Sequence, residues 1–409
     1  KEMAKTTVTI TPEDISLTGA PNWIQFSVTE YGSDAYIEID VQDSEGNHLA
    51  TLQKSCSNGP IWFNLNSVFN SYNSYNVPPV SPGWFDTGTG HSYRIVAKLV
   101  EDDNTTIVYE SPALYVLQGY ALPSESLDMS RYQYSANGFT LLTDRPTTYY
   151  VPGQKEFLSF AVGVPYITVS PVSLLLPASG GSQSVTINSN TSWLVGEAVR
   201  AKSGPVPINL KVLYKALTTS GIVLGTIEAQ TKTELNTMSV STCLLDIDSV
   251  LTKYPKTGIV RVSVIDGTKM ISNELEYRIH PASLHQLRPV YFINRFGGWD
   301  TFNFDAPIKE DISNEMDTYN RSLTPSYSKG EGLKMVARTS LNNTYTIEGA
   351  PVSDDVARWL KELALSRVVL DGEGNYIIIE EFKLTIDPEN RDMQIPTIKY
   401  RLSESYVNG

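Results

Sequence analysis

The sequence predicts a mainly β protein, in which tandem immunoglobulin- or fibronectin-like β-sandwiches are followed by a small α+β domain at the carboxyl end. Three observations predict this class. Short alternating or β-branched runs, separated by turn residues, fill nearly all of the chain before residue 350. One arrangement of these runs occurs twice. The only long amphipathic helical pattern comes after residue 350. At 409 residues the chain also exceeds the size of a single core, so several domains are expected.

Residues 1–118 form the first expected sandwich. Turn signals rich in Gly, Pro, Ser, Asn and Asp separate its runs, a spacing typical of immunoglobulin-like folds. The expected strands cover residues 23–28, 35–41, 62–65, 93–100 and 113–117.

The second expected sandwich, residues 166–285, repeats part of this layout. Residues 62–69 align with residues 244–251 in their apolar pattern, with Ser and Val at the same places. Each copy continues with a loop containing Tyr and Pro, a strand, a polar turn and another strand. The pattern therefore predicts a duplicated sandwich.

The aligned segments each predict one helical turn that closes the end of a sandwich. Asn66 and Asp248 are expected to accept backbone hydrogen bonds where the turn begins. Leu65 and Ile247 are expected to be buried at equivalent places in the two cores.

A connecting β segment is expected over residues 119–165, with strands at 139–143 and 157–162. Earlier in the chain, residues 88–91 read Gly-Thr-Gly-His beside a strand. We expect a solvated turn there in preference to a nucleotide-binding loop.

Residues 291–304, YFINRFGGWDTFNF, predict a hairpin. Six of the fourteen residues are aromatic, and Gly297 with Gly298 permits the positive φ of a tight reversal. Apolar residues alternate on both sides of this glycine pair, so a well-packed hairpin is the plain structural reading.

The carboxyl-terminal α+β domain is expected over residues 286–409. Ser353 is the expected N-cap of a helix that runs to residue 365, with acidic residues in its first turn. One apolar stripe is formed by Val356, Trp359, Leu360 and Leu363. Strands are expected at residues 367–370, 376–382, 383–386 and 395–402, with a turn at 371–374.

Composition excludes some classes of function. The net charge of −13 is spread along the chain, which disfavours nucleic-acid binding because that needs clustered Lys and Arg. No apolar run is long enough to cross a bilayer, and the amino terminus from Lys1 has no signal-peptide core.

Cys56 and Cys243 are too few for a disulfide framework or a zinc site, so both are expected to be buried or half-buried thiols. The 23 tyrosines and the low charged fraction of 19% suit permanent subunit interfaces, although tyrosine is also a good strand residue.

The sequence offers no catalytic, cofactor-binding or metal site. The four histidines, His48, His91, His280 and His285, are scattered and form no metal-binding motif. No nucleophile elbow or phosphate loop is present. Glu380 and Glu381 point to opposite faces of an expected strand, and residues 43–47 are expected to be a polar hairpin tip in preference to a loose calcium loop.

Residues 166–195 resemble the opening of BACON domains, which are small β-sandwiches of Bacteroidetes proteins. The matching features are Ser170-Pro171, the stretch from Pro177 to Gln183, Val185-Thr186-Ile187 and the Ser-Asn-Thr-Ser that precedes Trp193. The match ends after Trp193, so the expected module is partial.

The motif at residues 294–300, Asn-Arg-Phe-Gly-Gly-Trp-Asp, and the helix-strand-turn-strand layout near the carboxyl end resemble tail-region virion proteins of tailed phages and prophages of Bacteroidetes, crAss-like phages or their relatives. The resemblance implies a non-catalytic structural protein of the phage tail, baseplate or adaptor that acts as a homo-oligomer in the virion. Its expected partners are its own copies and other virion proteins, with a host-surface glycan as a further candidate and no nucleic acid or membrane insertion. The candidate assembly contacts are Arg295, Phe296, Trp299 and Asp300, with Arg295 and Asp300 able to form an ion pair.

Two other classes of function remain open. A BACON-like carbohydrate-binding protein on the cell surface of a gut bacterium would explain residues 166–195 directly. An enzyme is disfavoured because no catalytic motif converges. Neighbouring genes for tail assembly would favour the phage protein, and a signal sequence or lipobox would favour the bacterial one.

Overall fold

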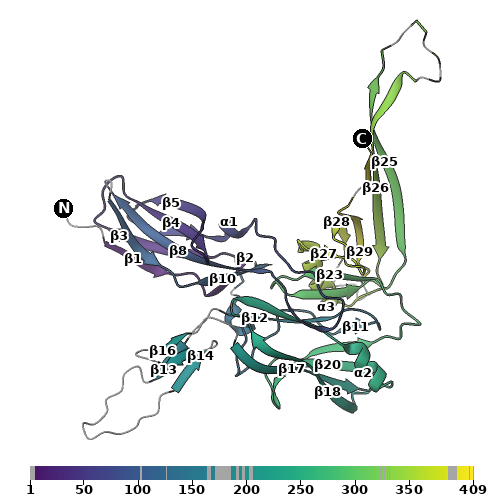
Figure 1. Cartoon of the computed structure of the whole chain (residues 1–409), viewed down its shortest axis with the longest axis horizontal. Coiled ribbons are helices and arrows are strands. Elements are labelled where there is room, and N and C mark those ends of the chain that lie inside the picture. The colour runs from purple at the N-terminus through teal and green to yellow at the C-terminus, as the bar shows by residue number, and fades with distance from the viewer. Residues whose placement is uncertain are drawn as a thin grey trace. The chain divides into compact units, whose positions relative to one another are not determined.

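The structure is a computed structural model, and it confirms a mainly β chain of tandem sandwiches with a small helical part near the carboxyl end (Figure 1). It describes residues 5–101, 104–125, 127–163, 167–170, 186–189, 193–195, 199–201, 206–322, 325–326, 328, 330, 332–385, 394–404 and 406–408. Two compact units are discontinuous in sequence. Unit 1 comprises Lys1–Thr143, Glu156–Leu275 and Asn294–Trp299, and unit 2 comprises Asp144–Lys155, Glu276–Ile293 and Asp300–Gly409. The four ranges expected from sequence stay a prediction.

The first sandwich lies in unit 1 and has two sheets. The smaller sheet has the order β1-β3-β6, with bounds β1 (Lys5–Ile10), β3 (Trp23–Thr29) and β6 (Ile61–Asn64). The larger sheet has the order β2-β10-β8-β4-β5, with β9 also paired to β8. Its bounds are β2 (Ile15–Gly19), β4 (Tyr36–Asp43), β5 (His48–Ser55), β8 (Gly90–Glu101), β9 (Asn104–Glu110) and β10 (Leu114–Tyr120).

Period-two alternation builds the core of this sandwich. Every second residue of β3 and β4 is buried, because successive side chains of a strand point to opposite faces. The buried residues include Ile24 and Phe26 of β3, and Ile37 and Ile39 of β4. The strands expected from sequence in this region are therefore confirmed, with small shifts at their ends.

The second copy repeats the strand order of the first. β4 lies between β5 and β8, and β17 (Val206–Leu217) lies between β18 (Val223–Leu235) and β20 (Ile259–Asp266). β3 pairs with β6, and β12 (Phe157–Val162) pairs with β19 (Ser239–Leu244). In unit 2, β11 (Thr148–Tyr150) runs parallel to β22 (Leu275–Ile279), as β2 runs parallel to β10 in the first copy. β21 (Lys269–Met270) corresponds to β9.

The duplicated helical turn is confirmed, and its cap is corrected. α1 (Asn66–Phe69) follows β6 and α2 (Ile247–Lys253) follows β19, so both turns occupy the same place in the strand order. In α2 the N-cap is Asp246, whose Oδ1 accepts from the N–H of Ser249. In α1 the N-cap is Leu65, and the Oδ1 of Asn64, one residue earlier, accepts from the N–H of Asn66. The expectation that Asn66 and Asp248 cap the turns was wrong, because a cap side chain must reach N–H groups two or three residues ahead of it.

An insertion lies between β12 and β17, where the first copy has only a short link. It contains two small antiparallel pairs, β13 (Ile167–Ser170) with β14 (Thr186–Ser189) and β15 (Trp193–Val195) with β16 (Val199–Ala201). The rest of the BACON-like segment, including its glycine turn, lies outside the described residues.

The expectation of a solvated turn at residues 88–91 was wrong. β7 (Gly83–Asp86) leaves the first sandwich and pairs with β19 of the second, within unit 1. The chain that follows is enclosed, so Thr87 and Thr89 are fully buried. Gly90 is required there because a Cβ at this position would overlap the hydroxyl group of Tyr115.

Residues 139–143 were expected to form a strand and do not, since only Phe139 makes an isolated bridge. A 3₁₀ turn, η1 (Met129–Tyr132), precedes this segment. Cys243 is buried and Cys56 is half-buried, as expected.

Unit 2 holds two sheets and the helices. One sheet has the order β24-β23-β27 and the other has the order β25-β26-β29-β28, with β30 also paired to β26. The bounds are β23 (Pro289–Ile293), β24 (Trp299–Asn303), β25 (Ile308–Asn320), β26 (Lys334–Glu348), β27 (Val369–Leu370), β28 (Ile377–Lys383), β29 (Thr397–Leu402) and β30 (Tyr406–Asn408). In the described residues the strand expected at 383–386 is absent beyond Lys383.

The expected helix is confirmed in two pieces, α3 (Asp354–Trp359) and α4 (Lys361–Leu365). Ser353 is its N-cap residue, although its side chain makes no capping hydrogen bond. The predicted stripe of Val356, Trp359, Leu360 and Leu363 is buried in one core with residues of β23, β24 and β29.

Two hairpins use the same turn, Asp-x-Glu-Gly-Asn. In residues 43–47 and in residues 371–375, the Asp carboxylate accepts the N–H groups two and four residues ahead and the Asn side-chain amide. Gly46 and Gly374 have φ values of +87° and +90°. Asp43 therefore builds a polar hairpin tip, as expected, and these hydrogen bonds lower the pKa of its carboxyl group.

Candidate assembly and binding sites

The tip of the predicted hairpin, Asn294–Trp299, is held by Asn294. The Oδ1 atom of Asn294 accepts the N–H groups of Phe296 at 3.0 Å and Gly298 at 3.1 Å, and its Nδ2 donates to the carbonyl of Leu142 at 2.7 Å. Gly297 has a φ of +85°. The glycine pair therefore makes the reversal that the sequence predicts.

Phe296 and Trp299 are buried inside unit 1. Phe296 stacks on Tyr132 with 4.7 Å between ring centroids, and Trp299 contacts Tyr75 and Phe157, each at 6.1 Å. The ring partners belong to unit 1 and lie outside residues 286–409, the domain in which the sequence placed this hairpin. The role of Phe296 and Trp299 as assembly contacts stays a prediction.

The charged residues of the motif have separate partners. Arg295 Nη1 lies 3.0 Å from Glu125 Oε1, and the pKa of Glu125 is lowered, first by a hydrogen bond from the Leu122 N–H and then by Arg295. In unit 2, Asp300 Oδ2 accepts the Trp359 Nε1–H at 3.2 Å. The ion pair expected between Arg295 and Asp300 stays a prediction.

The paired strands β25 and β26 extend from the rest of unit 2 as a long arm that the sequence did not predict (Figure 1). All thirteen residues of β25 are exposed. β25 is also the last strand of its sheet, so its outer backbone edge is unpaired within the described chain.

The register of the arm places apolar residues on one face. Directly opposed residues of an antiparallel pair share a face, and Ile308, Met316 and Ile312 lie on the same face as Leu341. Beyond a bulge, Val336 pairs with Thr318 on this face as well. We call Ile308, Ile312, Met316, Val336 and Leu341 the arm stripe.

The arm stripe continues the core face of the sheet. Ile347 and Tyr345 of β26 lie on this face, opposite Ile398 and Tyr400 of β29, and all four pack into or against the unit 2 core. Farther along the arm Ile312 is 64% exposed and Met316 is 55% exposed, whereas Leu341, where β30 pairs with β26, is half-buried. The opposite face carries mainly charged and hydroxyl side chains, namely Lys309, Asp311, Ser313, Glu315 and Asp317. The stripe face also carries Glu310, Asn314, Thr339 and Asn343, and Asn343 Nδ2 donates to Glu310 Oε1 at 3.0 Å. Exposed apolar residues grouped on one face of a two-stranded ribbon are typical of a segment that is completed by a partner.

Unit 2 also contains a pocket of about 690 Å³ that gathers two of the scattered histidines. The rings of His280 and His285 lie 4.3 Å apart between centroids, and Tyr149 lies 3.9 Å from His280. Asp305 bonds to His285 Nδ1 and to the N–H of Gln286. The sequence signal was weak, because no motif links positions 280, 285 and 305.

Burial and neighbouring charges perturb one imidazole of this cluster. The pKa of His280 is lowered, first by burial and then by the nearby His285, with Asp305 opposing the shift. Asp305 has a φ of +51°, a conformation that an L-residue adopts at some cost. Neither imidazole is hydrogen-bonded to a Ser, Thr or Cys side chain in the part of the chain that the structure describes. Among the described residues, no group of three His, Cys, Asp or Glu side chains could hold a metal ion.

No described helix is long and apolar enough to span a membrane.

Comparison with known proteins leaves the family open. No protein-family model and no curated protein matches the chain. Among solved structures, the chain is similar to the three N-terminal domains of the bacteriophage RB49 Highly Immunogenic Outer Capsid protein (Hoc), with 7% sequence identity. That similarity covers 68% of this chain and 70% of the other, with a TM-score of 0.18. A TM-score this low supports no inference about the present chain.

Proposed function

We propose that the chain is a non-catalytic structural component of a phage virion, and that it works in the tail, baseplate or adaptor region by assembling with its own copies. The observation that supports this most is the arm stripe, whose apolar residues extend along the arm beyond the core of unit 2. The resemblance of residues 294–300 and of the carboxyl-terminal layout to phage tail proteins supports the location.

In the simplest assembly, the arm stripes of two copies face each other about a two-fold axis, so that each stripe meets an identical one. Full burial of one such side chain is worth about 1.5–3 kcal/mol. Each stripe side chain is already about half covered, so the ten side chains of two copies would together contribute roughly 7–15 kcal/mol. Association costs about 4–15 kcal/mol, so the stripe alone gives weak pairing.

A permanent ring or sleeve needs more surface than the stripe. Obligate interfaces bury roughly 2,000 Å² or more. The unpaired edge of β25 is the natural source of further contacts, because a strand of a neighbouring copy can pair with it. The proposed assembly therefore combines an apolar face with a free backbone edge.

The proposal is tested by placing one charge on either face of the arm. Ile312→Lys puts an ammonium group in the stripe, whereas Ser313→Lys puts the same group on the polar face one residue away. Sedimentation velocity of the full chain over a range of concentrations is expected to show oligomers for the wild type and for Ser313→Lys. Ile312→Lys is expected to remain monomeric.

Two results would count against the proposal. A wild-type chain that stays monomeric at high concentration would remove the assembly role. Mass spectrometry of purified particles, from a phage that encodes the chain, should detect it in fixed stoichiometry to the other tail proteins. Its absence from those particles would remove the virion role.

A further inference from the structure

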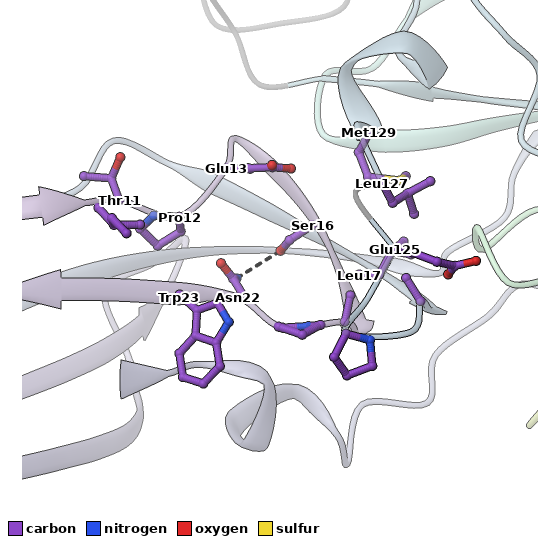
Figure 2. Close-up of a pocket in the computed structure, with 15 residues that line it drawn as sticks. Thr11, Pro12, Glu13, Ser16, Leu17, Asn22, Trp23, Glu125, Leu127 and Met129 are labelled. Carbon is purple, nitrogen blue, oxygen red and sulfur yellow. Dashed lines mark hydrogen bonds between the residues drawn. The ribbon is translucent and has the colours of Figure 1, made fainter. Parts of the chain in front are cut away.

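A pocket in unit 1 combines an exposed indole with hydrogen-bond acceptors. It has a volume of about 310 Å³ and is bordered by the β1–β2 loop, the β2–β3 loop and the chain that follows β10 (Figure 2). Figure 2 shows Trp23, Asn22 and Glu13 on one side of it, with Leu127 and Met129 on the other. None of these residues belongs to the arm stripe.

Asn22 lines this pocket with a side chain that is held in one orientation. Its side chain is fixed because Nδ2 donates to Ser16 Oγ at 3.0 Å and to the Tyr93 hydroxyl at 2.8 Å. Although the residue is only 4% exposed, its Oδ1 atom is not enclosed and accepts from no described residue. A fixed acceptor is therefore presented to the pocket, and a ligand with a hydroxyl or amide N–H can bind it without reorganising the site.

The remaining polar groups of the pocket are mostly acceptors as well. The pKa of Glu13 is raised, first by burial and then by the charge of Asp128, and no described cation pairs with this carboxyl group. The carboxylate of Glu125, in contrast, is neutralised by Arg295. The hydroxyl of Thr11 can donate or accept. A ligand with several hydrogen-bond donors and little charge fits this set.

An aromatic surface adjoins these acceptors. Trp23 is 43% exposed and contacts Trp62, which is 37% exposed, with 6.0 Å between ring centroids and 83° between ring planes. Both indoles lie on the outer face of the β1-β3-β6 sheet, because residues of β3 and β6 that alternate with them are buried. An indole presents an electron-rich face that attracts polarised C–H groups.

From these features we propose that the pocket binds a pyranose unit of a polysaccharide. The C–H face of the sugar would lie on Trp23, and its hydroxyl groups would donate to Asn22 Oδ1 and Glu13. A volume of about 310 Å³ is at the small end of ligand sites, so the pocket suits one sugar unit. The rest of the polysaccharide would leave the pocket across Trp62. This binding does not depend on the proposed assembly.

The same aromatic and acidic groups could also bind a cationic ligand, which is the alternative to a sugar. Cation binding needs charge, and this pocket has a single carboxyl group that no described cation pairs with, that of Glu13. The second carboxylate of the lining, that of Glu125, is paired with Arg295, and the other polar groups are neutral. A sugar therefore fits the lining better than an ammonium or guanidinium group.

The test uses the full chain and a panel of cello-, xylo-, manno-, malto- and chito-oligosaccharides, followed by saturation-transfer NMR and titration. We expect at least one of them to bind with a Kd of about 1 mM or tighter, with saturation strongest on ring C–H protons. Trp23→Ala is expected to weaken this binding at least tenfold. Glu13→Gln, which keeps a hydrogen-bond acceptor, should weaken it by a smaller factor. Tyr319→Ala, an exposed aromatic of the arm, is the matched control and should leave it unchanged.

Three results would overturn the proposal. The first is binding to none of the oligosaccharides by a folded wild-type chain. The second is binding that Trp23→Ala leaves intact, with circular dichroism showing the variant folded. The third is preferential binding of N-acetyl-lysine methylamide, lost at about 0.5 M NaCl, which would identify a cation pocket.

Discussion

Replacing Trp359 with Ala probes the packing of the carboxyl-terminal domain. The indole is buried between α3 and the strands of unit 2, with its ring centroid 5.6 Å from Phe292 and 6.3 Å from Phe302. Its Nε1–H is donated to the carboxylate of Asp300, which is itself buried. The substitution therefore removes both a large apolar volume and a buried hydrogen bond.

The two losses differ in size. Truncating a buried Trp to Ala costs about 3–5 kcal/mol, because the cavity collapses only in part. Trp359→Phe keeps most of the ring packing but leaves Asp300 without one donor, which costs about 1–3 kcal/mol. The difference between the two variants thus measures the packing contribution. Arg358→Ala, on the exposed side of the same helix, is the control and is expected to change stability by less than about 0.5 kcal/mol.

Hydrogen exchange is the suitable assay. A chain of two units does not unfold in one step, so a single global free energy would mix their contributions. Exchange of the amides of α3 and α4, measured by mass spectrometry, reports the opening free energy of this part alone. A change below about 1 kcal/mol for Trp359→Ala would refute the packing described here.

Three further predictions concern other parts of the chain. Leu65→Ala and Ile247→Ala should each lower the opening free energy of nearby amides by about 2–5 kcal/mol in hydrogen exchange, because both are buried at equivalent places of the duplicated sandwich, and a negligible loss at either site would contradict that equivalence. Gly297→Ala should destabilise unit 1 by at least about 1 kcal/mol, since φ is +85° and a Cβ would lie 2.8 Å from the Gln118 carbonyl oxygen, and unchanged exchange of the hairpin amides would disprove this. The lowered pKa of His280 means that the unfolded chain binds the proton more readily, so unit 2 should lose stability as pH falls through about 6.5, and His280→Asn should flatten the pH dependence of its exchange rates.

The sequence predicted those elements that depend only on neighbouring residues. The alternation in residues 23–28, the Gly297-Gly298 reversal and the spacing of Val356, Trp359 and Leu363 each appear in the structure, because side-chain periodicity alone decides which face is buried. The alignment of residues 62–69 with residues 244–251 went further, since it located equivalent turns in two copies of one strand order.

Features that depend on distant pairing were not predicted. β7 pairs with β19, more than 150 positions along the chain, so nothing near Thr89 in sequence signals that it is buried. His280 and Asp305 meet only because the fold places two loops of unit 2 together. The arm stripe depends on the register of β25 against β26. Both strands carry apolar and polar residues without a strict alternation, so the sequence does not specify this register.

Cysteine cross-linking tests most directly whether copies meet through the arm stripe. In a chain with Cys56→Ser and Cys243→Ser, single cysteines are introduced as Ile312→Cys or Met316→Cys in the stripe and as Ser313→Cys on the opposite face, and each protein is oxidised mildly. Disulfide-linked dimers should form rapidly for at least one of the two stripe positions and slowly for Ser313→Cys. Equal rates on both faces, or no dimer from either stripe position, would contradict assembly through this face.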